Sequence, residues 1–344
     1  MILPESLSQL LIPWYRANRR DLPWRHSTDP YRVWLSEIML QQTRVEAVKG
    51  RYLRFLEILP DVRALAECSE DRLMKLWEGL GYYSRARNLQ KAAKQIVEEY
   101  DGTFPSEPEL VLSLPGIGDY TAGAICSICF GLPTPAVDGN VLRLCTRLTA
   151  CREDITLPGT KQTVKDALLE HFSPESSGDL NQALMELGAT VCIPKGEPKC
   201  AVCPLREVCL SRENRLWREI PVRTPKKPRV KEKITVFLLR CQDRFALQKR
   251  PREGLLAGLW EFPSLPGALT PQQALDRAAE WGCQPLSPGK VIHREHEFSH
   301  REWEMTGYEI FCSTMPDRFI WAGKEELAGV YSLPSAFRKF LHDE

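Results

Sequence analysis

The hydrophobic pattern of this 344-residue chain changes once, near residue 220. Up to about Trp217, apolar residues recur every three or four positions, as in "YRVWLSEIMLQQTRVEAVKGRYLRFLEIL", a spacing typical of amphipathic helices. After residue 233, "ITVFLLR" and "RFALQKR" have the composition of strands, and "HREHEFSHREWEMTGYEIFC" alternates as strands do. One helical pattern, "TPQQALDRAAEWG", lies between them. The chain therefore predicts a mostly helical domain followed by a mixed α and β domain.

The segment that separates the two patterns has the composition of a linker. Residues 221–233 contain three prolines, six lysines or arginines and no aromatic residue. Proline stiffens an extended backbone, and repulsion between like charges extends it further. We therefore expect a helical domain over residues 1–220, a basic linker over 221–233 and a second domain over 234–344.

Composition excludes several classes of protein. Hydrophobic residues make up 43% of the chain and charged residues 26%, as in ordinary globular proteins. No run approaches the roughly 18 apolar residues of a membrane helix, and residues 1–20 lack the pattern of a signal peptide. These features predict a cytoplasmic protein, or a nucleoid-associated one in a bacterium. Thiols stay reduced there, so the 12 cysteines are not expected to form a disulfide network.

Four of these cysteines are concentrated in "CIPKGEPKCAVCPLREVC", residues 192–209. Cys192, Cys200, Cys203 and Cys209 follow the spacing C-x7-C-x2-C-x5-C. Structural zinc usually takes two close pairs of ligands, whereas this stretch has one close pair. Four unequally spaced thiolates suit a [4Fe–4S] cluster, in which each iron takes one cysteine. On spacing alone, zinc and four unrelated buried cysteines remain possible.

Two further stretches carry residues suited to DNA chemistry. In "LPGIGDYTAGAICSICFG", a turn containing Gly116 and Gly118 runs into a helix, and such a turn directs backbone N–H groups at an anion such as DNA phosphate. In "TPAVDGNVLRL", Asp138 precedes a helical pattern and is expected to cap it, which favours its ionised form. Glu37 lies among apolar neighbours, where burial would raise its pKa, although a helical glutamate is also typical of a solvent-facing position.

Together these motifs resemble those of the adenine DNA glycosylases of the MutY type, within the helix-hairpin-helix, iron–sulfur DNA glycosylase superfamily. The resemblance rests on "LPWR" (22–25), "SEIMLQQT" (36–43), "GLGYYSRARNL" (79–89) and "LPGIG" (114–118), and it spans almost the whole chain. The superfamily usually shows C-x6-C-x2-C-x5-C. This chain therefore carries one extra residue in the first gap, "IPKGEPK", where loop length is easily changed.

The resemblance implies a helix-hairpin-helix glycosylase domain with an iron–sulfur loop, followed by an α+β nudix-like domain. It implies removal of adenine mispaired with 8-oxoguanine or guanine in duplex DNA, by a monomer in base excision repair. Glu37 would protonate the adenine, and Asp138 would stabilise the sugar cation or bond to it covalently. Tyr120 stands where lyase-competent relatives carry a nucleophilic lysine, so no efficient lyase step is expected. Tyr120 and Asn140 would position the two carboxyl groups.

The resemblance also implies the residues that contact DNA and the cofactor. Gln42 and Tyr82 would wedge into the duplex beside Leu40, while Trp24 and Arg25 would line the adenine pocket. The remaining expected DNA-binding residues are Thr43, Gly116 and Gly118, and the loop Phe298, Ser299 and His300, which would read 8-oxoguanine. Cys192, Cys200, Cys203 and Cys209 would hold the [4Fe–4S] cluster.

Three rival functions are compatible with parts of the sequence. "HEFSH" (296–300) matches the zinc-protease pattern H-E-x-x-H, but its flanks alternate like strands. On a strand the two histidines would lie on the order of 13 Å apart, unless a turn brought them closer. A thymine-specific mismatch glycosylase is the second rival, and a non-catalytic lesion-binding protein is the third. Nucleotide hydrolysis is not expected, because the helix "LDRAAEWG" lacks the glutamates of a nudix hydrolase, which predicts a recognition module.

Overall fold

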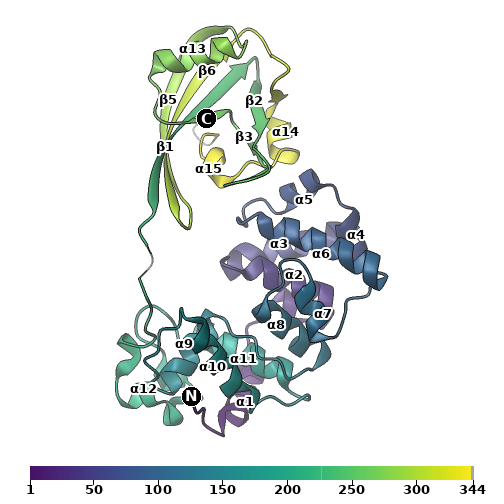
Figure 1. The fold of residues 1–344 in the computed structure, drawn as a ribbon, viewed down its shortest axis with the longest axis vertical. Helices are drawn as coiled ribbons and strands as arrows, with labels where there is room; N and C mark the ends of the chain where they lie inside the picture. Colours follow the sequence, from purple (N-terminus) through teal and green to yellow (C-terminus); the bar gives the residue numbers. More distant parts are fainter. Residues whose placement is uncertain (226, 342–344) are drawn as a thin grey trace. The chain divides into compact units, whose positions relative to one another are not determined.

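The computed structural model describes residues 1–225 and 227–341. Residue 226, in the expected linker, and residues 342–344, in the expected second domain, lie outside the described residues. The chain divides into two compact units, which are described separately below (Figure 1). The first unit comprises Met1–Glu67 and Arg87–Pro225, and the second comprises Cys68–Ala86 and Lys226–Glu344.

The first unit consists of helices that pack through their apolar faces. In α1 (Leu7–Asn18), the buried residues Leu7, Leu11 and Tyr15 recur every four positions and pack against the buried faces of α9, α10 and α11. The other helices are α2 (Pro30–Leu40), α3 (Val45–Ile58), α4 (Val62–Glu67), α6 (Ser84–Tyr100, which starts in the second unit), α7 (Pro108–Ser113), α8 (Asp119–Phe130), α9 (Gly139–Leu148), α10 (Pro158–Leu169), α11 (Ser177–Thr190) and α12 (Leu210–Glu213).

The helical hairpin expected near residue 116 is present. Helices α7 and α8 are joined by residues 114–118, and Gly118 caps α8 with an extended backbone. Gly116 has a φ of +80°, and a Cβ there would lie 2.6 Å from the Cβ of Asn88. Because no side chain fits that conformation and that space, only glycine permits this turn.

The second unit contains a mixed sheet with the strand order β3-β2-β1-β6-β5, in which β4 also pairs with β1 and β7 with β2. Strands β1 and β6 are parallel, and the other pairs are antiparallel. The strands are β1 (Val230–Cys241), β2 (Arg244–Lys249), β3 (Trp260–Glu261), β4 (Ser264–Pro266), β5 (Pro285–Glu297), β6 (Arg301–Cys312) and β7 (Ile320–Ala322).

Helices cover both faces of this sheet (Figure 1). Val236 and Leu238 of β1 pack in the same cluster as residues of α14 (Lys324–Gly329) and α15 (Ser335–Arg338). Phe237 and Leu239 pack on the other face, in a cluster with α13 (Pro271–Glu280). This two-sided burial explains why the middle of β1, residues 236–239, is an uninterrupted apolar run. The strands and the intervening helix predicted from the sequence are confirmed.

The division into units differs in two places from the boundaries expected from the sequence. Strand β1 begins at Val230, inside the expected linker, because Val230 already donates to the His300 carbonyl at 3.1 Å. The segment Cys68–Ala86, which includes α5 (Glu70–Leu76), groups with the second unit. Lys75 Nζ there donates to the carbonyl oxygens of Leu327 and Tyr331, both at 3.1 Å. These contacts link positions about 250 residues apart, and local sequence patterns do not predict such contacts.

Among the described residues, no helix is long and apolar enough to cross a membrane.

Candidate active site

A buried carboxyl group and a tyrosine form the centre of the candidate site. Glu37 lies on α2 with 7% of its surface exposed, and Tyr120, in the first turn of α8, donates a hydrogen bond to Glu37 Oε2 at 2.6 Å. Burial raises the pKa of Glu37 to about 7, and the nearby charge of Asp138 raises it further, while the Tyr120 hydrogen bond and Arg25 oppose that rise. Glu37 is therefore a buried carboxyl group that titrates near neutral pH.

The second carboxyl group, Asp138, caps α9 as the sequence predicts. One of its oxygens accepts the backbone N–H groups of Asn140 and Val141, both at 2.8 Å, and the other accepts Asn140 Nδ2 at 2.8 Å. Burial raises the pKa of Asp138 above its ordinary value, although these donors and the Arg143 charge act to lower it. Each donor stabilises the ionised form, so the geometry is that of a held carboxylate.

Arg143, which was not among the residues predicted from the sequence, extends this arrangement toward the cysteine-rich loop. Its guanidinium donates to Asn140 Oδ1 at 3.0 Å, to the Gly188 carbonyl at 2.6 Å and to the Cys192 carbonyl at 2.8 Å. The side chain is 95% buried, and burial lowers its pKa. The signal available in the sequence was the i, i+3 spacing of Asn140 and Arg143 on one helix face.

A second missed residue, Glu186, binds the expected pocket residue Arg25. Glu186 lies on α11 with 1% exposure and accepts Arg25 Nη2 at 2.7 Å and Arg20 Nε at 2.7 Å. Burial acts to raise its pKa, but the hydrogen bonds from the two arginines lower it to about 2. The neighbouring residue Met185 contacts the Tyr120 hydroxyl through Sδ at 3.1 Å. Glu186 is thus an ionised anchor for Arg25, and it directly follows Met185, which contacts Tyr120.

Trp24, the other expected pocket residue, is 93% buried. Its ring packs edge-to-face against Tyr52, with 5.6 Å between ring centroids. It precedes Arg25 in a short 3-10 helix, Pro23–Arg25, that begins with proline. Trp24 therefore serves the core of the unit and fixes the backbone from which Arg25 extends.

The two residues expected to wedge into DNA share an unusual backbone conformation. Gln42 is exposed and has a φ of +55°, and Tyr82 is 45% exposed and has a φ of +46°. Residues other than glycine rarely adopt this left-handed region, and functional sites are one of the places where they do. Leu40 ends α2 two residues before Gln42, and its carbonyl accepts the Thr43 N–H at 3.2 Å, which closes the turn.

The four clustered cysteines line a single cavity, so the structure brings together all four expected ligands. Burial raises the pKa of Cys203 to about 12, and the neighbouring thiols add to this effect. The buried Arg147 guanidinium lies beside the cavity, with Nη1 3.4 Å from Cys192 Sγ. The site therefore offers a donor set of four thiols next to the buried Arg147 guanidinium.

The loop Phe298–His300 forms the turn between β5 and β6. Phe298 N donates to the Arg301 carbonyl at 2.8 Å, and the Phe298 ring packs against Trp303 with centroids 4.9 Å apart. Ser299 and His300 are exposed. The Ser299 hydroxyl lies 2.7 Å from the Tyr82 hydroxyl, so two predicted DNA-contacting residues 217 positions apart meet within the second unit.

This turn does not support the zinc-protease pattern. His296 is on β5, where its ring packs against Phe298, and His300 follows in the turn, so the pair lacks the helix that the motif requires. Within residues 1–225 and 227–341, no three His, Cys, Asp or Glu side chains are arranged to hold one metal ion.

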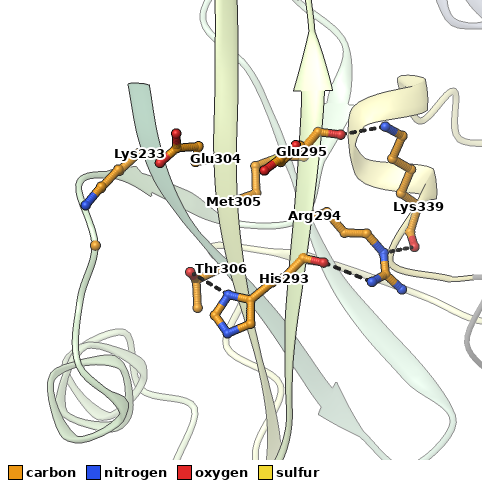
Figure 2. A pocket seen from close by; sticks show the side chains of 9 residues that line it. Lys233, His293, Arg294, Glu295, Glu304, Met305, Thr306 and Lys339 are labelled. Carbon is orange, nitrogen blue, oxygen red and sulfur yellow. Dashed lines mark hydrogen bonds between the residues drawn. The ribbon is translucent and has the colours of Figure 1, made fainter. Parts of the chain in front are cut away.

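A broad depression on the sheet of the second unit is also separate from the candidate site. Figure 2 shows a hydrogen bond between His293 on β5 and Thr306 on β6, and Lys339 Nζ donating to the Glu295 carbonyl at 2.6 Å. The lining of this depression mixes acidic and basic side chains and includes none of the site residues predicted from the sequence.

Comparisons with known proteins cover both units. A family model described as HhH-GPD superfamily base excision DNA repair protein matches residues 35–172, and a NUDIX domain model matches residues 235–343. The chain is 33% identical to the adenine DNA glycosylase of Homo sapiens, over 92% of this chain and 70% of that protein. It is 34% identical to the adenine DNA glycosylase of Buchnera aphidicola subsp. Acyrthosiphon pisum, over 85% and 83% of the two chains.

The chain belongs to the adenine DNA glycosylase family.

Solved structures support the fold of this adenine DNA glycosylase family member. A thermostable thymine-DNA glycosylase is 26% identical, with a TM-score of 0.54, over 60% of this chain and 94% of that one. An endonuclease III–DNA complex matches 62% of this chain with a TM-score of 0.53 at 22% identity, which supports the fold alone. The predicted architecture, a helix-hairpin-helix glycosylase domain with a nudix-like α+β domain, is confirmed. The protein is a DNA glycosylase, an enzyme that hydrolyses N-glycosyl bonds.

Proposed function

We propose that this enzyme removes adenine mispaired with 8-oxoguanine or guanine from duplex DNA, and that it does so without an efficient lyase step. The observation that carries the proposal is the buried Glu37, whose pKa is raised to about 7 and which Tyr120 holds by a hydrogen bond of 2.6 Å. A general acid is most effective when its pKa lies near the working pH. The pairing of Glu37 with Asp138 divides the work between two carboxyl groups, as in retaining glycosidases.

In the first step, protonated Glu37 donates a proton to N7 of the extruded adenine, so that the base departs as a neutral molecule. Bond breaking leaves positive charge on the sugar, and ionised Asp138 stabilises this oxocarbenium ion or forms a covalent bond with it. Glu37, now a carboxylate, then takes a proton from the water that completes hydrolysis. Tyr120 fixes the Glu37 carboxyl group, and Asn140 fixes Asp138.

The missing lyase step follows from the chemistry of residue 120. Burial raises the pKa of the Tyr120 hydroxyl well above its ordinary value, and the adjacent carboxyl groups add to this, so the phenol stays neutral. A phenol cannot form the Schiff base with the opened sugar that an amine forms. The product is therefore an intact strand with an abasic site.

Adenine must leave the base stack to reach Glu37, which costs a few kcal/mol of unstacking. Gln42 and Tyr82, with Leu40 and Thr43 in the Gln42 turn, would fill the vacated space, since the Gln42 and Tyr82 side chains are both exposed. Arg25, anchored by Glu186, together with Trp24 would border the extruded base. Gly116 and Gly118 would present backbone N–H groups to a phosphate.

Recognition of the opposite base would fall to Phe298, Ser299 and His300. The packing of Phe298 on Trp303 holds the turn, and the exposed Ser299 and His300 carry the polar groups that can distinguish 8-oxoguanine from guanine. The hydrogen bond between Ser299 and Tyr82 supports a shared role at the lesion.

We infer further that Cys192, Cys200, Cys203 and Cys209 hold a [4Fe–4S] cluster. All four thiols line one cavity, yet among the described residues no three potential ligands are arranged for a single metal ion. A cluster that takes one thiolate per iron spreads its ligands more widely than zinc does, so the residues fit a cluster. When bound, the cluster would cross-link residues 192–209, and Arg147 would offset part of its negative charge.

The rival function, thymine removal, has weaker support. The likeness to the thymine-DNA glycosylase covers 60% of this chain, whereas the human adenine DNA glycosylase aligns over 92%, including the second unit that carries Ser299 and His300.

The decisive experiment is single-turnover base release from three duplexes, with adenine opposite 8-oxoguanine, adenine opposite thymine, and thymine opposite guanine. We expect adenine release from the first duplex only, with strand cleavage appearing only after alkali. Release of thymine would reassign the substrate. Tight binding without release would make the protein a lesion sensor.

A further inference from the structure

One buried hydroxyl group beside the cysteine cavity has no partner in the protein. Ser211 lies in α12, two positions after Cys209, with 1% of its surface exposed. Ser211 is one of the residues that line the same cavity as the four cysteines. Across residues 1–225 and 227–341, Ser211 Oγ makes no hydrogen bond.

Other buried hydroxyl groups in this unit do have acceptors. Ser177, which is fully buried, donates to the Ser173 carbonyl at 2.7 Å, and Thr146 donates to the Leu142 carbonyl at 2.8 Å. A buried hydroxyl without a partner costs folding free energy, so a persistent exception calls for a partner outside the polypeptide.

The chemistry of the cavity restricts what that partner can be. Apart from the cysteines and Ser211, the lining side chains are aliphatic, aromatic, proline or arginine. None of these accepts a hydrogen bond well, and the arginines can only donate. Among the other side chains that line this cavity, the hydrogen-bond acceptors are therefore the cysteine sulfur atoms. Arg147 Nη1 already lies 3.4 Å from one of them, Cys192 Sγ.

We propose that the Ser211 hydroxyl donates a hydrogen bond to a sulfur atom of the iron–sulfur cluster and thereby raises the reduction potential of the cluster. The proposal rests on the cluster inferred above. Hydrogen bonds to the sulfurs are among the factors that set such potentials, because a donor stabilises the more negative, reduced state more than the oxidised state. Ser211 is thus a residue that tunes the cofactor without binding an iron.

The test compares Ser211→Ala with Ser177→Ala, a matched loss of one hydroxyl from an equally buried serine that does not line the cavity. Iron content, acid-labile sulfide and the visible charge-transfer absorption band first establish that each protein carries the cluster. The midpoint potential of its one-electron couple is then measured by voltammetry on a DNA-modified or carbon electrode.

We expect Ser211→Ala to lower the midpoint potential by about 59 mV, which is a tenfold change in the one-electron equilibrium. Ser177→Ala should leave the potential at the wild-type value. An unchanged potential in a fully loaded Ser211→Ala protein overturns the proposal, and a raised melting temperature in that variant would show that the hydroxyl was simply unsatisfied. Absence of iron and sulfide from the wild-type protein would instead overturn the cluster itself.

Discussion

Tyr120 donates a hydrogen bond to Glu37 Oε2 at 2.6 Å. This contact joins α8 to α2, although the two residues lie 83 positions apart in the sequence. The contact opposes the rise in the pKa of Glu37 that burial produces. In the proposed mechanism, a pKa near 7 lets the Glu37 carboxyl group donate a proton first and accept one afterwards.

Replacing Glu37 by glutamine should abolish base release while duplex binding stays nearly unchanged. Glutamine keeps the shape of the side chain but has no proton to donate, and the loss of a general acid costs about 10² to 10⁴ in rate. Glu57→Gln, a change on the exposed side of α3, is the control. Single-turnover release and equilibrium binding are measured on the same duplex. Wild-type turnover in Glu37→Gln would remove this residue from the mechanism.

The pH dependence of base release should follow the pKa of Glu37. Since the acid form donates the proton, the single-turnover rate should fall as pH rises through about 7. In Tyr120→Phe the hydrogen bond that lowers this pKa is lost, so the inflection should move to higher pH. Rate profiles of the two proteins from acid to alkaline pH provide the measurement. An inflection that stays in place would show that Tyr120 does not set the pKa.

The same pKa predicts how stability depends on pH. The folded pKa of Glu37, about 7, is raised from the ordinary value of 4.5, so the folded state favours the proton. The contribution of this group is fully present below pH 4.5 and is lost as pH rises through about 7, a loss of roughly 3 kcal/mol at most. Urea unfolding at pH 5 and pH 8 should therefore show a smaller decline in Glu37→Gln than in wild type. Equal declines would contradict the burial argument.

Replacing Arg143 by glutamine should impair both catalysis and the cysteine-rich loop. Glutamine is too short to donate the hydrogen bonds that Arg143 makes to the carbonyl oxygens of Gly188 and Cys192 and to Asn140. We therefore expect about 1–3 kcal/mol of destabilisation and slower base release. Arg152→Gln, on an exposed ion pair with Glu219, is the matched control. Melting temperature, iron content and single-turnover rate are compared. A loss of stability with normal release would separate Arg143 from Asp138.

Discrimination between 8-oxoguanine and guanine should depend on the contact between Tyr82 and Ser299. Tyr82→Phe and Ser299→Ala each remove one side of a 2.7 Å hydrogen bond. The double variant should therefore lose less of the preference for 8-oxoguanine than the sum of the two single losses. We expect a coupling energy of about 0.5–1.5 kcal/mol. The double-mutant cycle is measured from single-turnover rates of adenine release opposite 8-oxoguanine and opposite guanine.

Ser299→Ala combined with His300→Ala should reduce the preference for 8-oxoguanine over guanine more than Ser299→Ala alone. An unchanged preference would mean that the turn does not read the lesion.

Features determined by neighbouring residues were predictable from the sequence. The turn at Gly116, the cap at Asp138, the spacing of the four cysteines and the change from helix to strand each depend on a few adjacent positions, and the structure contains all of them. Asp138 could be predicted as a cap because its own side chain reaches the N–H groups two and three residues ahead.

The tertiary structure alone decided the rest. The pKa of Glu37 depends on burial by distant segments, and the ion pairs of Glu186 join residues more than 160 positions apart. Cys68–Ala86 groups with the second unit through long-range contacts, such as those of Lys75 with carbonyl groups about 250 residues away. Local sequence determines which conformations each segment prefers, whereas desolvation and charge pairing arise only when remote segments exclude water from the same place.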